Sequence, residues 1–267
     1  MEKEIPKYCG YFWPGHLLFM GRCPANTVHN HYALQVIVNR EGLFQLLTDG
    51  TSVEGGGVIV GSDHPHLLIS PCDVHSWIHL LIDHQSDVAK TLARRHLGEG
   101  KVKILDNNLI KRLRGCIGTP GNDLGSCGQA RDVYRKLVTE LDGYPDEHTA
   151  EAVDPRIQAT MDLLQGKYLA RKVVVADLAR EACLSESRLR HLFTEQIGIP
   201  LRRHILWVRL MTAVQFAVQG ASLTEAAHSA GFSDSAHLSR TYRRMYGITL
   251  SEVVKNSRFV QVISCFS

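Results

Sequence analysis

Two helix-turn-helix patterns in the C-terminal third place the strongest constraint on what this chain can fold into. The first spans 173–198, where small Ala182 allows two short helices to cross closely. Ser185 is suited to cap the second of these helices, and Gly198 followed by Pro200 ends it. This segment therefore predicts two short helices joined by a tight turn.

The second pattern spans 222–247 and begins with the sequence of a capping box, in which Ser222 and Glu225 satisfy each other's backbone amides. Gly231 allows the turn and Gly247 ends the last helix. Between the two units, 201–219 is one unbroken helical pattern. A helix of that length spans roughly 28 Å, which approaches the roughly 34 Å between successive major grooves on one face of DNA.

The charge distribution agrees with a polyanion-binding segment at the C-terminal end. Residues 155–267 carry a net charge of +7, from 15 Lys and Arg against 8 Asp and Glu. Residues 1–154 carry −4, from 15 against 19. A basic segment attached to an acidic one predicts a nucleic-acid-binding domain joined to a domain of another kind.

The N-terminal half has a different pattern. Short β-rich runs between turn signals over 10–82 predict a small barrel or sandwich, and amphipathic periodicity begins near residue 86. The predicted class is α+β: a β-barrel with flanking helices, followed by an all-α domain. The expected boundaries are 1–85 for the barrel, 86–143 for the flanking helices, 144–154 for a linker, 155–254 for the helix-turn-helix domain and 255–267 for a tail.

The helical domain carries a specific set of residues in order. They are Asp177-Leu178-Ala179, Ser185, Leu189, Leu192-Phe193 and Gly198-Ile199-Pro200, then Arg209-Leu210, Ala213, Leu223, Ala226-Ala227, Ala230-Gly231-Phe232, His237-Leu238-Ser239-Arg240, Tyr242-Arg243 and Tyr246-Gly247. This pattern resembles the double helix-turn-helix domain of the AraC family of transcription regulators. It departs from the family at Leu250, where Pro is usual, which affects only the last turn.

The resemblance implies roles for exposed residues on the second helix of each unit, which enters the major groove in this family. The base-reading positions would be Ser187, Arg190, His191, Ser235, Ala236, Ser239 and Arg240. Arg190 and Arg240 are the strongest of these, because a guanidinium pairs with guanine O6 and N7 through two hydrogen bonds. Phosphate contacts, which add affinity without sequence information, are expected from Arg202, Arg203, Arg243 and Arg244.

The N-terminal half resembles a cupin barrel, which often precedes this DNA-binding module. The residues that carry the resemblance are His29-Asn30-His31, Gln35, Gly42 and Pro71-Cys72-Asp73-Val74-His75. The resemblance implies a small-molecule effector pocket lined by His29, His31, Gln35, His75 and Trp77. Metal-bearing cupins use Glu where this chain has Gln35, so no cofactor is assigned, and a divalent metal on His29, His31 and His75 stays an alternative.

The expected protein is therefore an effector-responsive transcription regulator and not an enzyme. Its expected partners are double-stranded DNA, a small effector, a second copy of the chain bound through the helices at 86–142, and RNA polymerase if it activates transcription. No run approaches 18 apolar residues and residues 1–4 lack the pattern of a signal peptide, so a cytoplasmic location without membrane contact is expected.

Two alternatives remain open from the residues. One is a cupin metalloenzyme with an accessory domain, although the chain has no P-loop, G-x-S-x-G, dinucleotide fingerprint or H-E-x-x-H motif. The other is a regulator that senses metal or redox state through the histidines or Cys72. The seven cysteines are scattered without a C-x-x-C pair, which argues against a disulfide framework and a thiolate zinc site.

Overall fold

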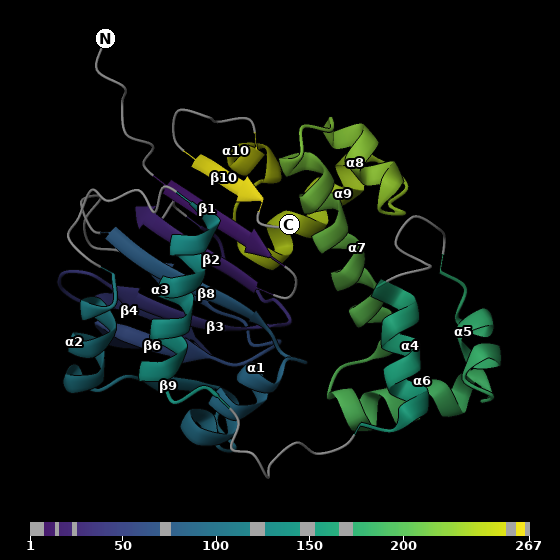
Figure 1. Ribbon diagram of the computed structural model, residues 1–267, viewed down its shortest axis with the longest axis horizontal. Coiled ribbons are helices and arrows are strands. Elements are labelled where there is room, and N and C mark those ends of the chain that lie inside the picture. The colour runs from purple at the N-terminus through teal and green to yellow at the C-terminus, as the bar shows by residue number, and fades with distance from the viewer. Residues whose placement is uncertain are drawn as a thin grey trace. The chain divides into compact units, whose positions relative to one another are not determined.

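The computed structural model describes residues 8–13, 16–22, 26–69, 76–117, 126–144, 153–165, 173–254 and 260–264 (Figure 1). Contacts divide the chain into two compact units, Met1–His148 with Tyr242–Ser267, and Thr149–Thr241. The division falls inside α9 (Ser235–Tyr246). The second unit thus ends thirteen residues before the boundary at 254 expected from sequence, since the segment from Tyr242 onward makes its contacts in the first unit.

The first unit is built on two β-sheets, which confirms the α+β class. The larger has the strand order β10 (Val260–Ser264), β1 (Tyr8–Trp13), β2 (His16–Arg22), β8 (Ser76–Asp83), β3 (Ala33–Asn39), β6 (Gly57–Val60) and β9 (Val102–Ile104). The smaller has the order β5 (Thr51–Gly55), β4 (Phe44–Thr48) and β7 (Leu67–Ile69). All neighbours are antiparallel except β1 and β10.

Two of these strands lie where none was expected. β9 falls within the segment 86–143, for which only helices were predicted, and β10 falls within the expected tail 255–267. Each adds to an edge of the larger sheet, β9 beside β6 and β10 beside β1. Both are short, and neither has the long alternating pattern that makes a strand visible in sequence.

Helices cover one face of the larger sheet, as Figure 1 shows for α2 and α3. They are α1 (Asp87–Leu92), continued as a π-helix over Ala93–Leu97, α2 (Asn107–Gly115) and α3 (Cys127–Glu140). Leu92, Leu113 and Leu137 are each at most 1% exposed, and they share one core with Leu18 and Val36 of the sheet. The apolar faces that the sequence showed in 86–143 are thus buried within the chain itself.

The second unit holds α4 (Pro155–Gln165), α5 (Val175–Glu181), α6 (Glu186–Ile197), α7 (Leu201–Val218), α8 (Leu223–Ser229) and the start of α9. The predicted helix signals are confirmed. The Ser185 hydroxyl accepts the Arg188 amide, Gly198 ends α6 at φ 76°, and Ser222 with Glu225 makes a complete capping box. The small and apolar residues form the inner face of both helix-turn-helix units: Leu178, Ala179, Leu189, Phe193, Ala226, Ala227 and Leu238 are all buried.

The remaining sequence expectations about cysteines and membranes have mixed outcomes. Cys127 is disulfide-bonded, whereas Cys9, Cys116 and Cys183 are free. Cys72 and most of the expected linker, 145–152, lie outside the described residues. No helix in the described part of the chain is long and apolar enough to cross a membrane.

Candidate nucleic-acid interface and histidine pocket

The second helix of the first helix-turn-helix unit, α6, presents a polar outer face. Ser187, Arg190 and His191 are all exposed, while Leu189 and Phe193 on the opposite face of the helix are fully buried. The Arg190 guanidinium forms a 2.5 Å ion pair with Glu186 one turn earlier. This helix can therefore offer a hydroxyl, an imidazole and a guanidinium to a partner, and the guanidinium must first exchange its carboxylate for another acceptor.

The equivalent helix of the second helix-turn-helix unit, α9, is fixed at its start by Asp234. The Asp234 carboxylate accepts the His237 amide at 2.6 Å. That hydrogen bond lowers the pKa of Asp234, so the cap stays ionised at neutral pH. Ala236 and Arg240 are exposed, whereas Ser235 and Ser239 are half-buried, and the Ser239 hydroxyl donates to the Ser235 carbonyl. Of the proposed base-reading residues in this unit, Arg240 thus projects furthest as a hydrogen-bond donor.

The four arginines expected to contact phosphates are all exposed. Arg202 and Arg203 occupy the first turn of α7, and Arg243 and Arg244 occupy the last turn of α9. Exposed guanidinium groups can form strong charge-assisted hydrogen bonds with phosphate oxygens. The contact roles assigned to these residues by sequence remain proposals.

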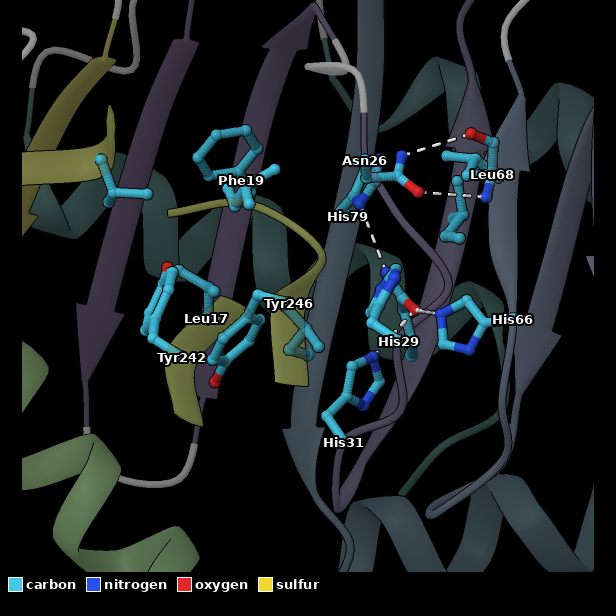
Figure 2. Close-up of a pocket in the computed structure, with 15 residues that line it drawn as sticks. Leu17, Phe19, Asn26, His29, His31, His66, Leu68, His79, Tyr242 and Tyr246 are labelled. Atoms are coloured by element: carbon cyan, nitrogen blue, oxygen red, sulfur yellow. Dashed lines mark hydrogen bonds between the residues drawn. The ribbon is translucent and has the colours of Figure 1, made fainter. Parts of the chain in front are cut away.

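A pocket in the first unit gathers four histidines and one glutamine (Figure 2). His29 precedes β3 and forms an isolated antiparallel bridge with His66, whose ring centroid lies 4.4 Å from its own. His31 and His66 each place Nε2 near Gln35 Oε1, at 3.0 and 2.8 Å. The Gln35 amide nitrogen reaches His79 Nδ1 at 3.4 Å.

These imidazoles are neutral at ordinary pH because burial disfavours their charged form. Desolvation, together with the smaller effect of neighbouring imidazoles, lowers the pKa of His31 to about 4, of His66 to about 2 and of His79 to about 3. Burial lowers the pKa of His29 as well. The pocket floor is thus a cluster of uncharged nitrogen donors.

The walls of the pocket are apolar and come from distant parts of the chain. Residues of β2, β3, β7 and β8 supply one part, and the segment from the end of α9 to α10 (Leu250–Val254) supplies the other. The apolar and aromatic lining residues are Leu17, Phe19, Ile37, Leu68, Leu81, Tyr242, Tyr246, Ile248 and Val253. Tyr246 stacks on His31 with ring centroids 6.1 Å apart. A small ligand with an apolar body and one polar end would suit this lining.

The structure brings together part of the pocket expected from sequence. His29, His31 and Gln35 line it, but His75 lies outside the described residues. Trp77 does not line it: this side chain lies on the same face of β8 as His79 and Leu81, but it is 1% exposed and packs against Phe44.

Sequence reasoning missed His66 and His79 as members of the pocket. The signal for His66 was the repeated His-x-His spacing at 64–66, which matches that at 29–31 and which the β-bridge brings together. His79 offered no local signal, since it is one polar residue in the apolar strand β8.

Comparisons with known proteins identify the C-terminal domain. Residues 178–256 match the family described as a helix-turn-helix domain. "Probable transcriptional regulator LumQ" of Photobacterium leiognathi is 34% identical over 84 residues, covering 31% of this chain and 34% of that protein. The Msm operon regulatory protein of Streptococcus mutans is 23% identical over 142 residues, covering 51% and 50%. The chain thus spans from a third to half of the length of these curated relatives.

The fold of the whole chain also has a solved counterpart. ToxT from Vibrio cholerae superposes with a TM-score of 0.56 at 14% identity, covering 89% of this chain and 96% of that one. A second ToxT structure, bound to an unsaturated fatty acid, gives a TM-score of 0.56 at 15% identity, covering 90% and 94%. At such identities the likeness shows a shared fold.

Proposed function

Because residues 178–256 form a helix-turn-helix domain of the AraC type, we propose that this chain is a sequence-specific DNA-binding transcriptional regulator. The observation that carries the proposal is the pair of helix-turn-helix units joined by α7, each with a buried apolar inner face and an exposed outer face bearing arginine. It is a binding protein that works in the cytoplasm, with no catalytic step of its own.

The proposal assigns base reading to α6 and α9. Arg190 and Arg240 each pair with a guanine edge in successive major grooves, and the shorter side chains on the same faces make the remaining base contacts. Arg190 exchanges Glu186 for guanine at little cost, since an exposed ion pair contributes only about 0–1 kcal/mol. The four exposed arginines of α7 and α9 neutralise phosphates, which makes binding dependent on salt.

The proposal assigns effector binding to the histidine pocket. Its apolar walls and uncharged polar floor suit a small molecule with an apolar body and one polar group. The fatty acid found in ToxT, a protein of the same fold, is a ligand of that general kind. Two copies of the chain bind DNA together, and an activating form contacts RNA polymerase.

The test uses the full-length chain. Selection of bound fragments from genomic DNA at about 0.15 M salt should enrich one site with two short elements about one helical turn apart. On that site, Arg190→Ala and Arg240→Ala should each weaken binding by about 1–3 kcal/mol, as measured by fluorescence anisotropy.

Arg135→Ala is the matched control, because it removes an exposed, ion-paired arginine from α3. It should leave affinity unchanged. Enrichment of no site, or equal affinity for all three variants and the parent chain, would overturn the assignment of α6 and α9 as reading helices.

A further inference from the structure

Three buried histidines of the pocket have ligand atoms close enough to share one ion. One ring nitrogen from each of His29, His31 and His66 lies within 4.8 Å of the others, and all three residues are at most 8% exposed. Gln35 Oε1 lies between two of them, at 3.0 Å from His31 Nε2 and 2.8 Å from His66 Nε2. Figure 2 shows His29, His31 and His66 close together in the pocket.

The outward-facing nitrogens of these rings are not supplied with hydrogen-bond donors by the groups beside them. Each ring directs Nδ1 at a backbone carbonyl, from Thr27 for His29, from Ala33 for His31 and from His64 for His66. A carbonyl only accepts, so each Nδ1 carries the ring's single proton, and each Nε2 is left with a lone pair. Two of these lone pairs then face the oxygen of Gln35, which is also an acceptor.

A bound cation would interact favourably with these nitrogen lone pairs and with the Gln35 oxygen at the same time. We propose that His29, His31 and His66, with Gln35 Oε1 as fourth donor, form a binding site for a divalent transition-metal ion, best suited to Zn²⁺. Three imidazole nitrogens and one oxygen match the four-coordinate preference of zinc.

The surroundings also suit a metal site. Nδ1–H donation to a carbonyl is the usual way in which a protein fixes the tautomer of a metal-binding histidine. The Gln35 amide nitrogen donates to His79 Nδ1, which directs Oε1 toward the other histidines.

The site is connected to the end of the second reading helix. The loop that carries His29 and His31 donates two backbone hydrogen bonds to α9, from Thr27 to the Gly247 carbonyl and from Asn30 to the Arg244 carbonyl. Metal that draws the two rings together fixes this loop and so the end of α9. This second step rests on the proposed function and makes the metal a signal that alters DNA affinity.

The first experiment measures metal on the full-length chain without DNA. Chelator-treated protein is equilibrated with ZnCl₂ under reducing conditions, dialysed and analysed for zinc, and affinity is measured against a chromophoric chelator. We expect about one zinc per chain and a raised melting temperature. His66→Gln should weaken affinity at least about tenfold, while Gln35→Glu should strengthen it, because it replaces a neutral oxygen with a carboxylate.

His228→Ala is the control, since His228 is an exposed histidine of α8, and it should bind zinc like the parent chain. Gln35→Glu keeps the proposal testable even if His66→Gln misfolds. A zinc content well below one ion per chain overturns the site. Zinc binding whose affinity neither variant alters also overturns it, because binding by cysteines would give that result. Zinc binding with no change in DNA affinity overturns only the second step. Zinc binding by a chain that selects no DNA site overturns the proposed function and leaves the metal site standing.

Discussion

Gly247→Ala should destabilise the first unit more than a glycine replacement of the same backbone conformation elsewhere. Gly247 has φ +72°, and a Cβ added to it would lie 2.7 Å from the Thr27 carbonyl oxygen and 2.9 Å from His29 Nδ1. Gly50, in the turn between β4 and β5, has φ +71° and nothing within 4 Å of its added Cβ. The two positions therefore share the backbone cost and differ only in crowding.

The expected magnitudes follow from these two terms. Alanine in the left-handed region costs about 1–2 kcal/mol at either site. Overpacking against backbone and a buried ring adds about 1–3 kcal/mol at Gly247 alone. Gly50→Ala should thus lower the free energy of unfolding by about 1–2 kcal/mol and Gly247→Ala by about 2–5 kcal/mol.

Urea unfolding followed by tryptophan fluorescence measures the difference. In a Trp207→Phe background the remaining tryptophans, Trp13 and Trp77, both belong to the first unit, so the signal reports its unfolding alone. Equal destabilisation by the two replacements would refute the reasoning, because it would mean that the loop at residues 26–30 does not pack closely on Gly247 in solution.

Other substitutions test the remaining parts of the structure. Ser222→Ala removes the capping box of α8 and should lower the stability of the second unit by about 1 kcal/mol in urea unfolding; an unchanged midpoint would contradict the cap. Leu137→Ala should cost about 2–5 kcal/mol because this side chain is buried between α3 and the sheet, whereas exposed Leu43→Ala should change stability by at most about 0.5 kcal/mol. Glu186→Gln frees Arg190 and should raise DNA affinity by less than about tenfold in anisotropy titrations; weaker binding would argue that Glu186 orients Arg190 for its contact.

The helical half could be predicted almost completely from sequence because its signals are local. Ser185, Gly198 and the Ser222–Glu225 pair act within one turn of their own helix, so their neighbours in sequence are also their partners in space. The same local logic located α7 and the inner faces of both units. The place of Tyr242 and Tyr246 in the wall of the histidine pocket was not predictable this way, since it brings together residues far apart in the chain.

The pocket was only half predictable for the same reason. His29 and His31 stand two residues apart and could be recognised as a pair, whereas His66 reaches them through a β-bridge that sequence spacing does not encode. Trp77 illustrates the opposite error. It lies on the same face of β8 as His79 and Leu81, which line the pocket, but it packs against Phe44 of a distant strand, and sequence spacing does not encode which residues of that face meet the pocket.

The parallel pairing of β1 with β10 has a consequence for how the protein is made. β1 pairs with β10 from Tyr8 to Phe12, yet β10 follows both helix-turn-helix units in the chain. During synthesis on the ribosome, the outer edge of β1 stays without this partner until the whole helical domain has emerged. An unpaired edge of that kind attracts other strands. Nascent chains therefore need protection at β1, and truncation after α10 should yield a protein prone to association through this edge.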